Sequence, residues 1–592
     1  MFKRYKGYLI FGMVLLILIA GTFVANASSF VHAQPATPHA NLTASAGKPI
    51  SGNPVLAKTV DMQNVPAATN QSLKGHQVAI PFRTGVSPAV YAQRKAAAAH
   101  YSNAVRGTTP YGAPAGSTTS KATPYTPIVT TNFAGMSDST SICPPFGCQP
   151  PDQALAVSFS LVFQGVNTSF DIYSLSGTQQ TGWPKTAQSF FGVPNPGSCD
   201  PNGPFLTDPR AFYDQNNNRF WAAIEQLEGV SGAPGANCPF LSKTWVAVSK
   251  TGDPRGAWNV YSFDMAKGTN NFADYTQFGF DQQAIYFSAN MLSASAGIFQ
   301  YPEVLSVRKL AMQNGQVVTP YGFNSLAVNS TQVDTVQPVL GESLQVGSAL
   351  GGQFINSFNI NFGGGQCSTG CSGVVVWSMK NPGTSSVAMT GLVVSTGTYS
   401  LAPNADQPSC NQCIDTNDTR ISGTPVWQRG IITFALETSV NNGSQNVPGI
   451  FWGQVVSSLN DDGSLAAASL FQSGYFAYTG DSAASFGALG ADSDGDLFMV
   501  FEFMSSTTNP SVVYTSRRVT LSPGFFHDGG KILQQGQAPF NGSSGGRWGD
   551  YEAVSPSGVP FTNDVWFSGQ YANASGDWST WIGHDKFVAG QS

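Results

Sequence analysis

The chain has 592 residues, more than a single hydrophobic core usually serves, so it must form several domains or one repeat array. Charged residues make up only 10% of the chain, against roughly 25% in an ordinary soluble domain. The formal net charge of −5 argues against a nucleic-acid partner, which would require a basic face. Together with 64 Gly and 37 Pro, this composition is typical of an extracellular β protein rather than a cytosolic enzyme.

Residues 1–33 are predicted to be a secretory signal peptide. Three basic residues precede an apolar run over 8–24, and small residues suited to cleavage follow at Ala27 and Ala33. The run is also long enough for an uncleaved anchor, since about 20 apolar residues span a bilayer. We therefore expect a secreted or extracellular-surface protein that contacts a membrane only if this segment stays uncleaved.

Residues 34–126 are predicted to be a low-complexity linker, because Ala, Pro, Ser, Thr and Gly dominate and no apolar periodicity is sustained. Within this linker, residues 86–105 could form a short helix with Ser87 as its N-cap and Pro88 in its first turn. The rest of the linker is expected to lack regular structure.

From about residue 127 a strand–turn–strand plan recurs, and such recurrence indicates a repeat architecture. Each unit opens at a landmark residue and continues as two apolar or aromatic strands separated by turn residues. A second hairpin follows in most units. The landmarks are Asp152, Asp208, Tyr275, Pro338, Arg420, Phe486 and Asp550. Seven units of four strands predict an all-β fold, a seven-bladed β-propeller over 127–592, with six or eight blades as alternatives.

The last unit is predicted to lack one strand, since little sequence follows the strand at 578–587. The apolar segment 127–133, which precedes the first landmark, is the expected donor of that strand. Closing the ring in this way would remove an exposed sheet edge.

All eight cysteines follow the signal segment, and an even number in an exported chain predicts disulfides. Their close sequential spacing favours four bridges between neighbours: Cys143 with Cys148, Cys199 with Cys238, Cys367 with Cys371, and Cys410 with Cys413. The alternative is a zinc site formed by the last four, whose CxxxC and CxxC spacings resemble metal ligands. Export to an oxidising compartment favours the disulfides.

Five segments carry a family resemblance: PPDQALAV (150–157), DPRAFYDQNNNRFWAA (208–223), TGDPRGAW (251–258), RWGDY (547–551) and WSTWIG (578–583). They resemble a family of exported, largely uncharacterised bacterial β-propeller proteins, which look distantly like sialidase propellers. The resemblance covers about 150–585 and implies a fold and export rather than an activity. The sequence departs from the family pattern at Ser158-Phe159, where a Gly-Pro dipeptide is expected.

The residue types present limit the chemistry that the protein could perform. Only His527 and His584 lie in the predicted propeller, and neither belongs to a motif with a nucleophile. A Ser-His-Asp device or a His-rich metal centre is therefore not expected, and neither is a cofactor. Any catalysis would rest on carboxylates, Tyr and Arg, with Asp550, Tyr551 and Glu552 as the candidate catalytic residues.

Charged residues at the starts of the first strands form the predicted binding site. Because the first strand of each blade lines the channel, these side chains could converge on one mouth and hold a carboxylate or a sugar. They are Asp152, Asp208, Arg210, Arg420, Arg547 and Asp550. The competing interpretation is that they cap turns or bridge neighbouring blades.

A weaker alternative is calcium at Asp492, Asp494 and Asp496, which alternate like the ligands of an oxygen-rich loop. The downstream Glu of such a loop is missing, and Asp494-Gly495 between strands favours a hairpin turn.

The overall prediction is a non-catalytic recognition module for a glycan or a protein ligand outside the cell. A glycosidase- or sialidase-like hydrolase is the alternative, because the propeller fold alone does not decide between them.

Overall fold

The computed structural model describes residues 42–69, 78–79, 85–102, 104–106, 110–115, 128–139, 142–143, 148–341, 351–358, 367, 370–542, 546–559 and 562–587. The predicted signal peptide lies outside these residues. Within the described ranges, no helix combines the length and apolar character that a membrane crossing needs.

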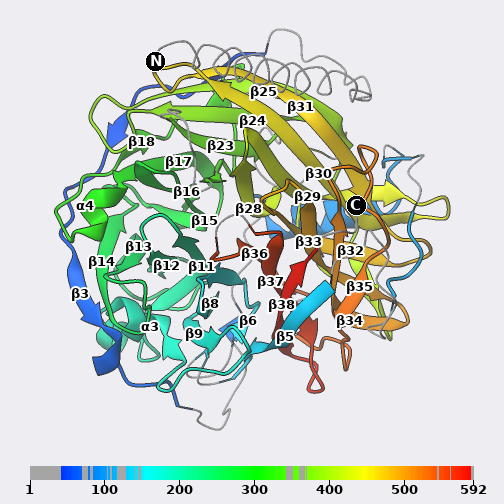
Figure 1. Ribbon diagram of the computed structural model, residues 1–592, viewed down its shortest axis with the longest axis horizontal. Coiled ribbons are helices and arrows are strands. Elements are labelled where there is room, and N and C mark those ends of the chain that lie inside the picture. The colour runs from blue at the N-terminus through cyan, green and yellow to red at the C-terminus, as the bar shows by residue number, and fades with distance from the viewer. Residues whose placement is uncertain are drawn as a thin grey trace, which may run out of the picture. The chain divides into compact units, whose positions relative to one another are not determined.

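Antiparallel sheets follow one another around a common centre (Figure 1). Seven of them have four or more strands, and we number them in chain order. The main strands are given from the innermost outward. Sheet 1 has β7 (Ala154–Val157), β8 (Leu161–Val166), β9 (Ser169–Ser174) and β10 (Lys185–Thr186), and sheet 2 has β11 (Phe205–Asp214), β12 (Arg219–Glu228), β13 (Leu241–Ser249) and β14 (Ala257–Asp264). Sheet 3 has β15 (Asn271–Phe280), β16 (Ala284–Ser293), β17 (Phe299–Arg308) and β18 (Tyr321–Phe323).

The main strands of sheet 4 are β21 (Gln337–Pro338), β23 (Gly351–Ser357), β24 (Cys371–Lys380) and β25 (Ala388–Tyr399). Those of sheet 5 are β28 (Ile421–Gln428), β29 (Ile431–Asn441), β30 (Asn446–Leu459) and β31 (Leu465–Phe476). Sheets 6 and 7 consist of β32 (Ala483–Ala491), β33 (Leu497–Ser505), β34 (Thr508–Arg517) and β35 (Lys531–Gln534); and β36 (Ala553–Pro556), β37 (Asp564–Ala572), β38 (Trp578–Lys586) and β5 (Ile128–Ser137). The all-β propeller fold is thus confirmed.

The propeller has six blades rather than the predicted seven, and six was one of the alternatives. Sheet 4 departs furthest from a regular blade: it has seven strands and begins with the two-residue β21. The following strand, β22 (Leu340–Gly341), pairs in parallel with β28 of sheet 5. Pro338 has no N–H to donate to a ladder, so the landmark of this unit cannot support a long first strand.

Four of the seven landmark residues share an unusual backbone conformation. At Asp208, Tyr275 and Phe486 φ is 57°, 59° and 58°, and each first strand loses its pairing register there. Asp152 also has a positive φ, of 42°. A positive φ is unfavourable for residues other than Gly, so the surroundings must hold these positions.

Buried polar side chains from the preceding sheet hold several of these positions. Asn167 Oδ1 accepts a hydrogen bond from the Asp208 N–H at 2.9 Å. The Asn290 amide oxygen accepts one from the Thr335 N–H at 2.7 Å, and the Glu437 carboxylate accepts one from the Phe486 N–H at 3.3 Å. We call these contacts inter-sheet ties. Since buried N–H groups require acceptors, the ties orient each first strand relative to the sheet before it.

Apolar side chains fill the space between neighbouring sheets. Phe212 and Trp221 of sheet 2, for example, belong to the same buried cluster as Phe278 and Phe287 of sheet 3. The Phe212 and Phe278 rings lie 4.8 Å apart, so the period-2 pattern of the strands places one face of each sheet against the next.

Sheet 7 joins the two ends of the propeller sequence. β5 pairs antiparallel with β38, from Ile128 opposite Lys586 to Ser137 opposite Ser579. The Thr130 hydroxyl lies 2.7 Å from His584 Nδ1 across this pairing. Without β5, the β38 edge would be unpaired.

Residues 42–69, which were expected to form a linker, lie along the outer edges of three sheets. β1 (Ala44–Ser45), β2 (Ile50–Ser51) and β3 (Lys58–Asp61) pair with β25, β18 and β14. Strands of two to four residues produce no detectable periodicity, so sequence patterns could not reveal them. Residues 105, 111 and 115 then bridge to sheets 5 and 6. We call the described residues between 42 and 115 the N-terminal strap.

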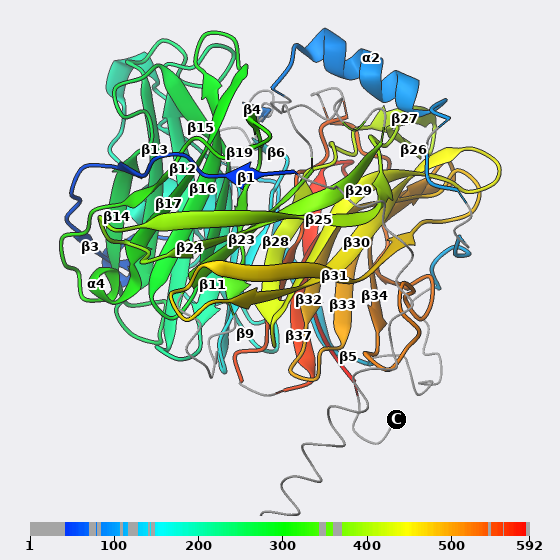
Figure 2. The ribbon, with the colours of Figure 1, turned by 90° about the horizontal axis from the view of Figure 1, so that it is seen from above.

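The helix expected within 86–105 is present as α2 (Pro88–Ala98), with Ser87 accepting from the Val90 N–H at 3.4 Å. It lies on the same side as the hairpin of β26 (Ala405–Gln407) and β27 (Cys410–Ile414) (Figure 2). Lys95 Nζ donates to Thr416 Oγ1 and to the Asn417 carbonyl, both at 2.8 Å, just before β28 begins. α2 therefore covers what we call the proximal end of the ring, where the innermost strands begin. The opposite end is the distal end.

Short elements complete the described structure: α3 (Ala187–Phe191), α4 (Lys309–Gln313), η1 (Met62–Asn64), η2 (Gly197–Cys199), β4 (Val78–Ala79), β6 (Cys148–Gln149), β19 (Ala327–Val328) and β20 (Thr331–Gln332).

The four predicted disulfides are confirmed: Cys143–Cys148, Cys199–Cys238, Cys367–Cys371 and Cys410–Cys413. The last two bridges use all four cysteines of the alternative zinc site.

Deletion of the strap and of β5 should lower thermal stability in two steps. A variant lacking 34–120 loses the edge strands and α2, and one lacking 34–137 also removes the ten residues of β5. The second deletion should cost more, because it exposes the β38 edge and its apolar contacts. Differential scanning calorimetry of both variants beside the full chain measures the two steps. Equal melting temperatures for the two variants would contradict the role of β5.

Candidate functional site

The structure brings the predicted binding residues together at the proximal end but buries them. The exposed fractions of Asp152, Asp208, Arg210, Arg420, Arg547 and Asp550 range from 0 to 7%. Tyr551 and Glu552, the candidate catalytic residues beside Asp550, are each 1% exposed. These residues therefore form an internal polar network rather than a mouth open to solvent.

Arg547 and Asp550 form a bidentate ion pair at the centre of this network. The two guanidinium Nη atoms donate to the two carboxylate oxygens of Asp550 at 2.5 and 2.6 Å. The Asp550 N–H donates to Asp152 Oδ1 at 2.8 Å, and Asn417 Nδ2 donates to Asp550 Oδ1 at 3.1 Å. The pair thus connects sheet 7 with the segments that precede sheets 1 and 5.

Two other arginines stack on tyrosine rings. The Arg210 guanidinium carbon lies 3.4 Å from the centre of the Tyr551 ring, and that of Arg420 lies 4.6 Å from the centre of the Tyr275 ring. Arg420 is also paired with Asp418 through Nε and Nη2, at 2.8 and 2.7 Å. Both stacks join residues of different sheets, so they act as bridges.

The acidic residues of the network are buried, and burial changes their pKa values. Burial, followed by the charge of Asp550, raises the pKa of Asp152 to about 7, against the opposing effect of Arg547. Burial likewise raises the pKa of Asp208 well above its usual range. Oxygens of Asp152, Asp208 and Asp550 lie within 4.8 Å of one another, a spacing that could hold a hard cation. However, both oxygens of Asp550 already accept from Arg547.

Glu552 is similarly occupied within the protein. Its Oε2 accepts a hydrogen bond from Gln153 Nε2, and burial raises its pKa to about 8. The Tyr551 hydroxyl donates to the Pro209 carbonyl at 3.2 Å. The sequence left two interpretations of these residues, a ligand site and bridges between neighbouring sheets. Bridging accounts for more of their contacts.

α2 closes the proximal end over this network. Tyr91 donates to Asp415 Oδ1 at 3.0 Å, and the Asp415 N–H donates to the Gly546 carbonyl at 2.9 Å. The loop that contains Asp415 thus links α2 to the segment that carries Arg547.

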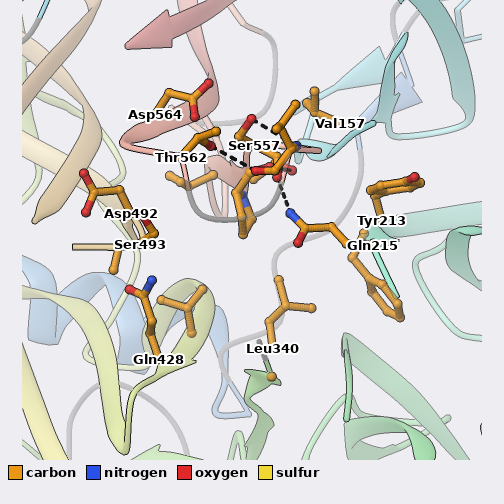
Figure 3. Close-up of a pocket in the computed structure, with 18 of the residues that line it drawn as sticks. Val157, Tyr213, Gln215, Leu340, Gln428, Asp492, Ser493, Ser557, Thr562 and Asp564 are labelled. Carbon is orange, nitrogen blue, oxygen red and sulfur yellow. Dashed lines mark hydrogen bonds between the residues drawn. The ribbon is translucent and has the colours of Figure 1, made fainter. Parts of the chain in front are cut away.

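An open pocket lies at the distal end instead (Figure 3). It contains about 820 Å³ of empty space, the part open to solvent included. Aromatic and aliphatic side chains form much of its wall, including Phe212, Phe280, Val426 and Trp427. Its polar lining residues are Tyr213, Gln215, Gln428, Asp492, Ser493, Ser555, Ser557, Thr562 and Asp564. We call it the distal pocket.

Asp492 reaches this pocket from the turn between β32 and β33. Its Oδ1 accepts from the N–H groups of Asp494 and Asp496, at 2.9 and 3.0 Å, which is the geometry of a hairpin turn. Burial and the nearby Asp496 raise the pKa of Asp492 to about 7. The turn interpretation of this segment therefore fits, while calcium binding stays an untested prediction.

Asp564 lines the pocket at the start of β37. Its Oδ2 lies 2.6 Å from His584 Nε2. Burial acts to raise the pKa of Asp564, but the hydrogen bond with His584 and those with neighbouring hydroxyls outweigh it, so the pKa ends below its usual range. The His584 ring stacks on Trp566, with centroids 4.3 Å apart.

The sequence analysis did not single out Asp564 or predict its contact with His584. The two residues are 20 positions apart and meet only through the β37–β38 pairing, in which Trp566 lies opposite His584. Alignment of that hairpin by its aromatic residues could have found them. Gln215 lies in the segment 208–223 that carries the family resemblance, but neither it nor Trp427 was predicted to line a site.

Comparison with known proteins identifies no family for the chain. No family model and no curated protein matches it. Among solved structures, it is similar to a Hadza microbial sialidase, with 11% identity, 62% of this chain and 65% of that chain covered, and a TM-score of 0.32. The chain thus spans slightly less than two thirds of that sialidase.

Two other solved structures are similarly distant. A Trypanosoma rangeli sialidase in complex with sialic acid shows 8% identity, 74% and 59% coverage and a TM-score of 0.32. The polysaccharide lyase Uly1 shows 11% identity, 90% and 100% coverage and a TM-score of 0.30. Neither a shared family nor a shared activity follows from likeness at this level.

Substitution of Arg547 by Ala should destabilise the protein by about 3–5 kcal/mol, because it leaves the Asp550 carboxylate buried without its partner. Arg255→Ala is the matched control, since Arg255 pairs with Asp253 at 2.8 Å where both side chains are about half exposed. That change should cost no more than about 1 kcal/mol. Urea unfolding of the two variants measures the difference, and equal costs would contradict a structural role for Arg547.

Asp492→Asn should change the pH dependence of stability. The pKa of Asp492 is about 7 in the folded state and near 3.8 without burial, so the folded protein holds the extra proton between these values. The wild type therefore loses stability as pH rises through this range, and the Asn variant does not. The difference in free energy of unfolding between the variant and the wild type should therefore favour the variant more at about pH 8 than at about pH 4, by on the order of 1 kcal/mol or more.

Asp494→Asn is the matched control for this measurement, because Asp494 is an exposed residue of the same turn. Thermal unfolding at the two pH values compares the variants. An equal pH-dependent gain in both would contradict the effect assigned to burial of Asp492.

Proposed function

We propose that this protein is a secreted or cell-surface β-propeller that recognises a carbohydrate ligand in the distal pocket. Export is supported by the basic and apolar pattern of residues 1–33 and by four disulfides, which persist in oxidising compartments. We therefore propose the distal pocket as the ligand site, in place of the proximal end that the sequence analysis predicted.

The composition of the pocket carries this proposal. Aromatic side chains at Tyr213 and Trp427, which are only partly buried, can face the C–H surface of a sugar ring. Amide and hydroxyl groups at Gln428, Ser493 and other lining positions can exchange hydrogen bonds with sugar hydroxyls. A concave site with apolar walls and a few polar groups suits a small ligand better than the flat surface of a folded protein.

The scarcity of charge in the chain is also consistent with a neutral ligand. Both acidic lining residues, Asp492 and Asp564, sit at one side of the pocket, and no Lys or Arg side chain lines it within the described part of the chain (Figure 3). An anionic ligand would be repelled by Asp564, whereas hydroxyl groups can donate to it.

A glycan array probed with the purified full chain tests the proposal, followed by calorimetric titration of the strongest hit. Gln428→Ala should weaken that binding about five- to tenfold, which corresponds to the loss of one hydrogen bond. Gln300→Ala is the matched control, because Gln300 is exposed and lies outside the pocket. A hit whose affinity is unchanged in Gln428→Ala would place the ligand elsewhere, and binding to proteins alone would refute a carbohydrate ligand.

A further inference from the structure

We infer that the distal pocket binds one end of a carbohydrate chain, and that the next sugar residue of this chain packs on Phe159 at the rim of the pocket. This inference rests on the proposed carbohydrate ligand and goes beyond it, because it specifies an oligosaccharide rather than a free monosaccharide. It assigns a binding role to an aromatic residue that was not among the predicted site residues.

Phe159 lies in the turn between β7 and β8, directly beside the pocket. Val157, the last residue of β7, lines the pocket (Figure 3), and Phe159 follows it by two residues. The Cα atoms of the two residues are therefore at most about 7 Å apart. From the other side, Gly558 packs on this turn so closely that an added Cβ atom would lie 2.5 Å from the Phe159 nitrogen. Ser557 and Val559, which flank Gly558, also line the pocket, so the turn forms part of its rim.

The side chain of Phe159 is left in solvent. It is 58% exposed, whereas Val157 and Leu161 on either side of the turn are buried. Val559, on the adjoining loop of sheet 7, is 46% exposed as well. Removal of apolar surface from water is favourable, so a ligand that covers these two side chains gains free energy that folding alone does not provide.

The backbone that carries Phe159 is held firmly. The Ser158 N–H donates to the Leu161 carbonyl at 2.9 Å, and Ser158 Oγ accepts from the N–H groups of Ser160 and Leu161 at 3.2 and 3.0 Å. The close packing of Gly558 restricts the turn from the other side. An aromatic ring on a fixed backbone loses little conformational freedom when a ligand binds, which favours its use as a contact surface.

The rest of the rim is polar wherever the structure describes it. The corresponding turns of sheets 2, 3, 5 and 6 carry exposed polar residues, which are Asn217, Gln282, Arg429 and Asp494. Among the described turns at this end, large exposed apolar side chains occur at Phe159 and Val559, in the neighbouring sheets 1 and 7. A sugar chain that leaves the pocket therefore finds apolar contact on this one side.

The chemistry of the rim suits a sugar residue that follows the one in the pocket. Part of the pocket is open to solvent, so a ligand bound there is not enclosed and can continue past the rim. The C–H face of a sugar ring packs on an aromatic ring, while the hydroxyl groups at its edge stay hydrated. Phe159 offers such a face, and its side chain has no polar group that would need a hydrogen-bond partner.

The test is a calorimetric titration of the full chain with the strongest hit from the glycan array, and with fragments of one, two and three residues cut from either end of it. Affinity for the wild type should rise about three- to tenfold from one residue to two. Phe159→Ala should abolish this rise and keep the affinity for the one-residue fragment, which also shows that the variant is folded. Phe159→Tyr should retain the rise, because the ring is kept.

Phe525→Ala is the matched control, since Phe525 is similarly exposed, at 55%, but lies outside the pocket. It should bind every fragment like the wild type.

The outcomes separate this inference from the proposed function. Equal affinities for one and two residues refute the inference, and so does a rise that Phe159→Ala retains or that Phe525→Ala also loses. Loss of the one-residue fragment in Phe159→Ala contradicts a role confined to the second sugar residue. In each of these cases, weaker binding in Gln428→Ala leaves the proposed function standing. If no glycan binds to the wild type, the proposed function fails together with the inference.

Discussion

The ring depends on one kind of hydrogen bond, in which a buried side chain of one sheet accepts from a strained backbone N–H of the next. Asn167 with Asp208, Asn290 with Thr335 and Glu437 with Phe486 show it most directly. The left-handed conformation costs on the order of 1–3 kcal/mol at each such residue. Loss of the acceptor would also leave a buried N–H without a partner, which costs about 1–3 kcal/mol. The strained conformation and the hydrogen bond that holds it would then both cost stability. The three ties therefore help to set the direction of the first strands of sheets 2, 4 and 6.

The two ends of the ring consequently differ in character. At the proximal end, the ties bring acids and arginines so close that they satisfy one another, and Lys95 of α2 covers the segment between them and solvent. At the distal end the last residues of several first strands line the pocket. Many of the few acidic residues of this chain are therefore buried, which is why a low charge content accompanies a conspicuous set of Asp and Arg landmarks.

Much of the architecture could be predicted because repetition is visible in sequence. The landmarks, the disulfide pairs, α2 and the all-β class all follow from local patterns of turn residues, cysteines and capping. The position of the site could not be predicted in this way. Arg547 and Asp550 look available in sequence, since burial depends on what the other sheets contribute around them. Asp564 and His584 looked unremarkable, because strand register, rather than spacing, brings them together.

The pairing of β5 with β38 also has a consequence for the order of events during synthesis. Thr130 and His584 are 454 positions apart, and Tyr91 and Asp415 are 324 apart. Residues that leave the ribosome early must therefore wait for partners made near the end of translation. Chains dominated by such distant pairings fold slowly and expose unpaired edges meanwhile. The ring can therefore close only after its last strand has been made.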